Sequence, residues 1–242
     1  MNETVAVEQA VPGVFARAIG IITSPKATFE QVVKAPRAIG ILALTAILFT
    51  ACASTMALTE RGRAALIDFQ TQNLDKAKAM GFPIPDASYD GLEQQVKYTP
   101  ITTGIAMFVG LPIGLLIFSG VLYAVFNAIM GGTADFKQVM AVTAHVGIIG
   151  AVGNVFATAI HLARGYMTLS VANLGMLFPM LRENSFAANL LTFFDFFRVW
   201  SLIVLAIGLG VLYKRKTSSI ATGFFIVLLI VGLAVSYFTS KG

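Results

Sequence analysis

An apolar stretch near the C-terminus decides the fold class: residues 193–213 read FFDFFRVWSLIVLAIGLGVLY. Apart from Asp195 and Arg198, every residue in it is apolar, aromatic or small. About 20 consecutive residues of this kind are long enough to cross the hydrocarbon core of a bilayer as a helix. The stretch therefore predicts a transmembrane helix that carries two charges near its beginning.

The composition of the whole chain has the same character. Of its 242 residues, 57% are hydrophobic and only 12% are charged. A soluble domain normally carries about 25% charged residues. We therefore expect an all-α integral membrane protein, because a helix satisfies its backbone hydrogen bonds internally when no water is present.

Five segments have the length and composition of membrane-spanning helices. They are residues 39–58, 101–130, 139–163, 187–213 and 220–238. A straight helix over the second segment would be about 45 Å long at 1.5 Å per residue. We expect this helix to tilt, to extend past the headgroups, or to bend at Pro112. The pattern predicts a five-helix bundle that forms one domain over residues 39–242.

Residues 1–38 predict an N-terminal cytosolic or interfacial segment with two short amphipathic helices. Apolar residues recur at helical spacing in each helix: Phe15, Ala18, Ile19 and Ile22 in the first, and Phe29, Val32 and Val33 in the second. Basic residues lie between them: Arg17, Lys26 and Lys34. This pattern suits helices that lie in the headgroup layer. Packing against the cytosolic ends of the bundle is the alternative.

Two longer connections join the spans. Residues 59–100 form the one long polar loop, for which we expect a helix over Glu60–Met80, an end at Gly81, and a short second helix near residues 91–97. Acidic residues in this loop lack the spacing of a calcium-binding loop, so we interpret them as a solvated face. The connection from Arg164 to Phe186 is apolar but too short to span, which predicts an interfacial or partly re-entrant segment.

Charge and cysteine content exclude several kinds of protein. Cys52 is the only cysteine, so the chain can form neither an intramolecular disulfide nor a cysteine-clustered metal site. The formal net charge of +5 is expected to serve orientation and headgroup contact, not nucleic-acid binding. Basic residues crowd the first span, at Lys34 and Arg37, and the turn at residues 214–216. We therefore expect a cytosolic N-terminus and an outside C-terminus.

Few polar side chains within the spans could carry chemistry. His145 and His161 lie about 160° apart around their helix and about 24 Å apart along it, so they cannot bind one metal ion. No serine has the sequence context of a nucleophile, so we expect no enzyme activity and no cofactor. In the second span, Gly110 and Gly114 form a G-x-x-x-G pair that predicts close helix packing.

Asp195 and Arg198 are three residues apart, so we expect them to share one face of the fourth helix, where they can pair. A charge within the bilayer is costly, and pairing lowers that cost. We consider His145 and Asn154 as partners for their remaining polar atoms. Two interpretations stay open: the charges are a strut that fixes helix packing, or they line a ligand- or proton-binding cavity.

Three motifs, read together, resemble those of a known family. SPKATFEQVVKAP (residues 24–36) leads into the first span, and GGTADFKQVMAVTAH (residues 131–145) joins the second and third spans. Asp195, Phe197 and Trp200 form D-x-F-x-x-W at the head of the fourth span. With five spans, this order is similar to the Yip-type (Ypt-interacting, Rab-associated) membrane domain family in its short prokaryotic form, over residues 15–238.

The resemblance implies a non-enzymatic scaffold or adaptor that contacts the lipid bilayer and other membrane proteins. It also implies a multi-pass protein of a prokaryotic cytoplasmic membrane. Eukaryotic relatives carry a longer cytosolic N-terminal region and associate with Rab GTPases, whereas residues 1–38 are short, so we do not expect Rab-type GTPase binding. The alternative function is a small-solute or lipid transport component with a polar intramembrane site at Asp195 and Arg198.

Overall fold

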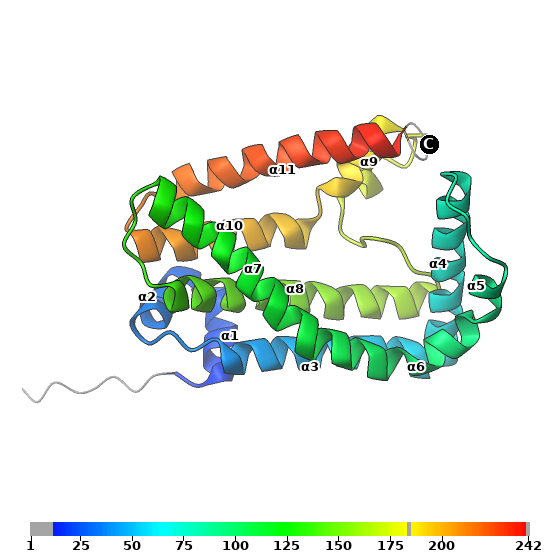
Figure 1. Ribbon diagram of the computed structural model, residues 1–242, viewed down its shortest axis with the longest axis horizontal. Helices are drawn as coiled ribbons and strands as arrows, with labels where there is room; N and C mark the ends of the chain where they lie inside the picture. Colours follow the sequence, from blue (N-terminus) through cyan, green and yellow to red (C-terminus); the bar gives the residue numbers. More distant parts are fainter. Residues whose placement is uncertain (1–11, 183–184, 241–242) are drawn as a thin grey trace, which may run out of the picture.

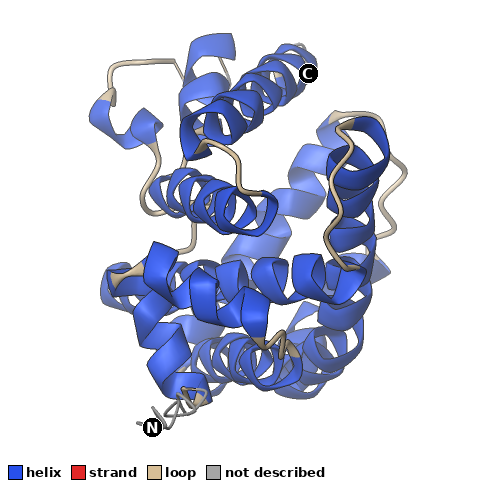
Figure 2. Cartoon of the chain, turned by 90° about the vertical axis from the view of Figure 1, so that its left-hand side faces the viewer, coloured by secondary structure: helices blue, strands red, loops and turns tan. Residues whose placement is uncertain are grey.

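The computed structural model describes residues 12–182 and 185–240 of the chain. Within these ranges the regular secondary structure is helical, apart from an isolated bridge between Asn173 and Asp195. Figure 1 shows the long helices lying roughly side by side, and Figure 2 shows the same bundle from the end that carries the first two helices. The expected all-α helical bundle is confirmed.

Five apolar helices are long enough to cross a membrane. They are α3 (Ile39–Leu58), the continuous helix Leu92–Ile129, α8 (Phe136–Arg164), α10 (Phe196–Tyr213) and α11 (Thr217–Thr239). The continuous helix consists of α6 (Leu92–Ile105), η1 (Ala106–Gly110), α7 (Leu111–Tyr123) and η2 (Ala124–Ile129). Five spans place α1 and the C-terminal end of α11 at opposite ends of the bundle (Figure 1).

The helix α8 forms the centre of the bundle. In its most apolar window 61% of the residues are buried, against 11% in the second span and 17% in the fifth. It packs against α3, α7 and α10. Its fully buried residues Val142 and Ile149 form one core cluster with Ile41 of α3 and Leu209 of α10. The second and fifth spans therefore lie at the periphery.

The N-terminal helices α1 (Val14–Thr23) and α2 (Pro25–Lys34) pack against one end of the bundle, where α2 contacts α8 and α10. Phe29 of α2 is fully buried. A Cβ atom on Gly208 of α10 would lie 3.0 Å from the Phe29 ring and 2.6 Å from Val142, so glycine permits this close contact. The outward face of α1 stays apolar and exposed, with Phe15 and Ile19.

The polar loop forms a helical layer across the end of the bundle opposite α1 and α2 (Figure 1). Its main element is α4 (Glu60–Ala79). Thr59 is the N-cap residue of this helix, and its hydroxyl accepts a hydrogen bond from the Gly62 amide. Gly81, with a φ of +88°, follows the end of the helix. The short helix α5 (Ala87–Asp90) follows.

The separate short helix expected near residues 91–97 is instead the beginning of α6 and continues into the second span. The helix passes through Pro100 and Pro112 without a break. A π-helical turn at Ala106–Gly110 precedes Pro112, and such wide turns accommodate the hydrogen bond that a proline cannot make.

The single helix expected over residues 187–213 is wrong in one respect, because the structure divides it into α9 (Phe186–Phe193) and α10. The break lies at Phe194 and Asp195, neither of which is helical, and the backbone of Asp195 is extended. The carboxylate of Asp195 accepts a hydrogen bond from the first turn of α10, and this competes with a continuous helix. A short 3-10 helix, η3 (Leu174–Leu177), lies in the preceding connection and does not span.

The G-x-x-x-G pair does not support close packing within this chain, contrary to expectation. A Cβ atom on Gly110 or Gly114 would meet no other atom within 4 Å. The second span runs past α3 and α8 with space beside these glycines, because its inward contacts come from larger residues such as Leu115 and Leu122. Close approach occurs instead at Gly153 and Gly208, where aromatic rings lie against the backbone.

Candidate functional site

Asp195 lies at the N-terminus of α10, where its carboxylate holds two parts of the chain. One oxygen accepts a hydrogen bond from the backbone amide of Arg198 at 3.0 Å, which makes Asp195 the N-cap of the helix. The other oxygen accepts a hydrogen bond from the hydroxyl of Ser170. Ser170 belongs to the connection after α8, so the carboxylate links this connection to the fourth span.

Backbone hydrogen bonds reinforce the same junction. The amide of Phe196 donates to the carbonyl of Ala172 at 2.9 Å, and the amide of Leu174 donates to the carbonyl of Phe194 at 3.0 Å. Asn173 and Asp195 form the antiparallel bridge between these two bonds. The connection between the third and fourth spans is thereby fixed to the beginning of α10.

The expected side-chain pair of Asp195 and Arg198 is not formed. The guanidinium of Arg198 donates a hydrogen bond to the carbonyl of Phe193 at 2.8 Å and lies 4.6 Å from the centroid of the Phe193 ring. Asp195 precedes the first turn of α10 with an extended backbone, so its carboxylate turns toward the helix N-terminus. Arg198 is exposed, which places its charge at the surface of the bundle.

The partners expected for Asp195 were also wrong, because Ser170 takes the place proposed for His145 or Asn154. The ring of Phe197 lies 5.7 Å from that of Phe156 on α8. From Phe156 to His145 is about 16 Å along α8 at 1.5 Å per residue. His145 is therefore too deep in the bundle to reach Asp195. The buried Oδ1 of Asn154 has no hydrogen-bond partner.

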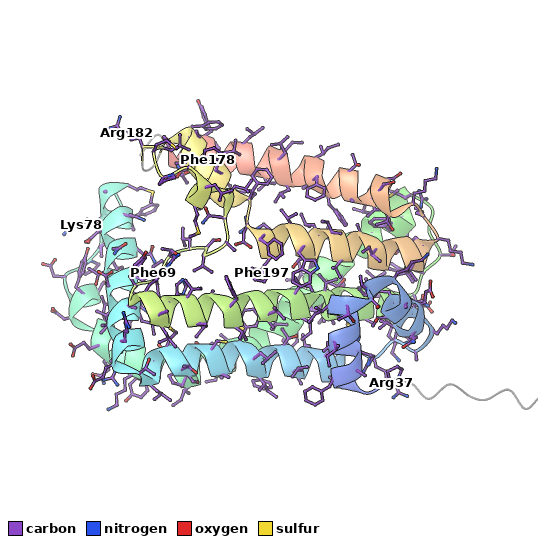
Figure 3. The ribbon with its side chains drawn as sticks, turned by 180° about the vertical axis from the view of Figure 1, so that it is seen from behind. Arg37, Phe69, Lys78, Phe178, Arg182 and Phe197 are labelled. Carbon is purple, nitrogen blue, oxygen red and sulfur yellow. The ribbon has the colours of Figure 1, made fainter. Side chains whose placement is uncertain are left out.

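The two aromatic residues of the D-x-F-x-x-W motif pack against the bundle. A Cβ atom on Gly153 would lie 2.7 Å from the Phe197 ring, so Phe197 fills the space that this glycine leaves on α8. Figure 3 shows Phe197 between α10 and α8. The ring of Trp200 lies 6.3 Å from that of Phe197 and 5.8 Å from that of Phe196. The cap formed by Asp195 and the packing of Phe197 and Trp200 together favour the first interpretation of this motif, in which it fixes how the helices pack.

A second polar contact, which the sequence did not indicate, lies deep in the bundle between α1 and α8. Arg17 of α1 is only 5% exposed, and His145 of α8 is fully buried. The Nη1 atom of Arg17 lies 3.3 Å from Nε2 of His145 and 3.1 Å from the carbonyl oxygen of Arg37. The guanidinium thus joins α1, the beginning of the first span, and the third span.

The hydrogen bonds define the proton positions on His145. Its Nδ1 atom lies 2.7 Å from the carbonyl oxygen of Ala141, which can only accept, so Nδ1 carries the hydrogen. The Nε2 atom is then a lone-pair acceptor that faces the N–H of Arg17. A neutral imidazole fits this place, because a protonated ring would point a second N–H at the guanidinium.

The buried position of Arg17 has an electrostatic cost. Burial, together with the positive charge of Arg37, lowers the pKa of the Arg17 guanidinium. Its Nε atom is buried without a hydrogen-bond partner. An arginine retains its proton even when the pKa falls, so its contacts with neutral acceptors must stabilise the charge.

A third polar cluster joins the ends of the second and fourth spans. The hydroxyl of Tyr213 donates to Oδ1 of Asn127 at 2.7 Å, and the Asn127 amide donates to the carbonyl of Ala134 at 2.7 Å. The ring of Tyr213 stacks on that of Phe126 with centroids 4.9 Å apart. A Cβ atom on Gly132 would lie 2.6 Å from the Tyr213 ring. This cluster holds the turn before α8 against the end of α10.

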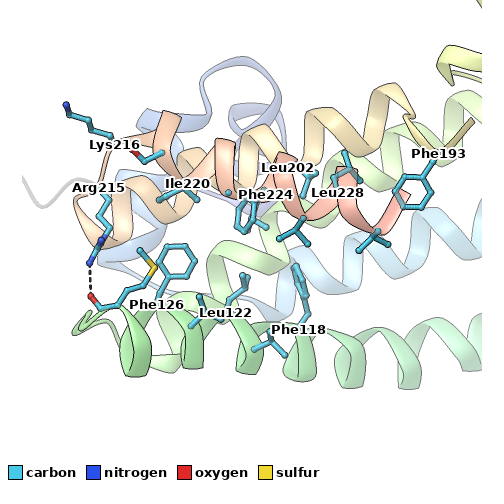
Figure 4. A pocket seen from close by; sticks show the side chains of 18 residues that line it. Phe118, Leu122, Phe126, Phe193, Leu202, Arg215, Lys216, Ile220, Phe224 and Leu228 are labelled. Carbon is cyan, nitrogen blue, oxygen red and sulfur yellow. Dashed lines mark hydrogen bonds between the residues drawn. The ribbon is translucent and has the colours of Figure 1, made fainter. Parts of the chain in front are cut away.

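A large groove, here called the α7–α11 groove, opens beside this cluster. It has a volume of about 720 Å³ and lies between α7 and η2 on one side and α10 and α11 on the other. Its apolar wall includes Phe118, Leu122 and Phe224. Figure 4 shows Arg215 and Lys216 at one end and Phe193 at the other, with the guanidinium of Arg215 donating to the Met130 carbonyl at 2.7 Å.

The arrangement gives little support to a polar transport site at Asp195 and Arg198. Neither residue lines the α7–α11 groove or the smaller cavity between α3, α7 and α8. Within residues 12–182 and 185–240, no group of three His, Cys, Asp or Glu side chains is placed to hold a metal ion. His161 accepts a hydrogen bond from the Thr168 amide at 3.4 Å, which fastens the end of α8 to the following connection.

The sequence contains weak signals, or none, for the contacts and the groove that the structure shows. Arg17 and His145 are 128 positions apart, and Arg17 looks like one of several basic residues on an amphipathic helix. Ser170 is an ordinary serine in an apolar loop. The basic turn at residues 214–216 was visible, but nothing indicated that an apolar groove ends there.

Comparisons with known proteins cover nearly the whole chain. The family model described as Yip1 domain matches residues 19–238. The membrane protein YknW of Bacillus subtilis (strain 168) is 24% identical over 227 residues, which cover 92% of this chain and 88% of YknW. No solved structure matches the chain.

Replacing Asp195 tests its role as a cap. We expect Asp195→Ala to lower the free energy of unfolding by about 1–2 kcal/mol, because the first turn of α10 and the Ser170 hydroxyl lose their acceptor. Arg198→Ala should cost less than about 0.5 kcal/mol, because Arg198 is exposed. The measurement is unfolding of the purified protein in a denaturing-detergent titration. If Arg198→Ala restores the stability of Asp195→Ala, the two charges form a pair and this account of the motif is wrong.

Proposed function

The chain belongs to the Yip1 domain family, and we propose that it acts as a non-enzymatic adaptor that binds other integral membrane proteins through its peripheral spans. The proposal rests first on the distribution of burial among the spans. The second span leaves about nine-tenths of its apolar window unburied, although it lies in the middle of the chain. Such a surface is available to lipid and to helices of partner proteins.

The chemistry of these surfaces suits association within the bilayer. On α7, exposed Ile113, Leu116 and Ile117 recur at helical spacing beside small residues. On α11, exposed Ile226, Leu229 and Ile230 do the same. Helices associate within lipid through van der Waals packing of such faces, with small residues permitting close approach. The interior of the bundle, in contrast, is filled by α8 and the helices that pack against it.

Site-specific photocross-linking in cells tests the adaptor function. We expect a cross-linking residue at Ile117 or Ile230, which are 65% and 60% exposed, to give discrete protein adducts that mass spectrometry can identify. The matched control is Ile47 on α3, which is 54% exposed and belongs to a more buried span. Absence of protein adducts at Ile117 and Ile230, or the same adducts at all three positions, would contradict the proposed partner surface.

We further propose that the end of the bundle with α1 and α2 lies on the cytosolic side. Basic residues gather there: Arg37 before α3, Lys137 in the first turn of α8, and the turn at residues 214–216. Cytosolic loops carry an excess of Lys and Arg near the membrane. Because the number of spans is odd, the C-terminus then lies outside.

Reporter fusions test this orientation. A reporter fused after the last residue should give the signal of the outer side, and one inserted near Thr217 should give the cytosolic signal. The control is a reporter placed in the polar loop near Gly81, which should agree with the C-terminal fusion. The opposite set of signals would reverse the proposed orientation.

A further inference from the structure

The α7–α11 groove has an apolar wall built from matching stripes on two helices. On α11, Ile220, Phe224 and Leu228 recur at every fourth position, and Val227 and Val231 lie beside them. On the opposite side, Phe118, Leu122 and Val125 follow the same helical spacing. The volume of about 720 Å³ lies within the range of about 300–1,000 Å³ that is usual for sites that bind small molecules.

The groove opens toward the bilayer and not toward water. Val121 and Val227, which line it, are 55% and 58% exposed and belong to membrane-spanning helices. An occupant would therefore enter sideways from the lipid phase. This favours a lipid over a water-soluble ligand.

The apolar part of the groove, beyond its basic end, matches one leaflet in length. From Ile220 to Val231 it runs about 16 Å along α11, at 1.5 Å per residue. One leaflet contributes about 15 Å to a hydrocarbon core of about 30 Å. A partner helix would have to cross the whole core, whereas an acyl chain from one leaflet ends where this groove ends.

Cationic groups lie at one end only. Arg215 and Lys216 line the groove at the end that Figure 4 shows opposite Phe193. The hydrogen bond to Met130 uses one of the five N–H donors of the Arg215 guanidinium, so the others can meet an anion. Lys216 precedes α11 and is exposed, and Ser219 also lines this end. The N-terminus of α11 adds its own partial positive charge.

From these features we propose that the α7–α11 groove binds one anionic phospholipid. The acyl chain lies along the apolar wall of α7 and α11, and the phosphate lies against Arg215 and Lys216 at the N-terminus of α11. The basic residues select for a negative headgroup, and the apolar wall supplies contact with the chain. This site is independent of the proposed partner surface, because Ile117 and Ile230 do not line it.

Native mass spectrometry of the full-length protein in detergent tests the site, with phosphatidylglycerol or phosphatidylcholine added as the probe. We expect one retained phosphatidylglycerol, with at least tenfold preference over phosphatidylcholine. The double change Arg215→Gln and Lys216→Gln should abolish this preference. The control is Lys137→Gln with Lys214→Gln, which removes the same charge from the first turn of α8 and the end of α10, at residues that do not line the groove.

A second variant, at Gly223, fills the apolar part of the groove without a steric clash. A Cβ atom on Gly223, which lines the groove, would meet no other atom within 4 Å, so Gly223→Leu should fold and fill the space. We expect it to reduce retention of both lipids at least tenfold. The matched control is Ala234→Leu, an exposed position on the same helix beyond the groove.

Three results would overturn the proposal. The first is equal retention of the two lipids by the unmodified protein, and the second is equal lipid retention by the Gly223→Leu and Ala234→Leu variants. The third is a cross-linking residue at position 223 that gives adducts with another protein instead of lipid. The adaptor test uses other positions, and the lipid tests measure lipid retention by native mass spectrometry, so failure of the adaptor proposal leaves the lipid result unaffected.

Discussion

The guanidinium of Arg17 is buried, so it requires hydrogen-bond acceptors inside the bundle. This requirement constrains how the N-terminal segment packs against the spans. Its Nη1 atom contacts the neutral acceptor nitrogen of His145 and the carbonyl oxygen of Arg37. A buried donor left without an acceptor costs about 1–3 kcal/mol, more when it is charged. These two contacts tie α1 to α8 and to the beginning of α3.

The rest of the architecture is arranged around α8. Its buried faces leave the second and fifth spans at the periphery, where they enclose the α7–α11 groove and present apolar surface to the bilayer. At the far end of α8, Asp195 and Phe197 hold the connection and the fourth span against it. The polar groups of the spans thus fasten helices together, and the exposed surfaces remain available for lipid and partners.

Sequence patterns predicted the fold to a large extent, because hydrophobic length and helical spacing are local properties. The five spans, the helix α4 and the non-spanning connection after α8 were all visible in this way. The break at Asp195 was not, because an aspartate near a helix beginning fits both a cap and a buried charge. The Arg17–His145 and Ser170–Asp195 contacts were missed because each joins residues far apart in the chain, and nothing local distinguishes them. The groove likewise depends on how two distant spans cross.

We infer that a neutral His145 stabilises the buried charge of Arg17, and a double-mutant cycle on these two residues measures this coupling. The measurement is unfolding in a denaturing-detergent titration of His145→Phe, Arg17→Met and the double variant. We predict that His145→Phe alone is the least stable, because it leaves a buried guanidinium N–H without an acceptor, and that adding Arg17→Met recovers about 1–3 kcal/mol. If the two single costs simply add, or if neither variant differs from the parent, the contact does not hold α1 to the bundle.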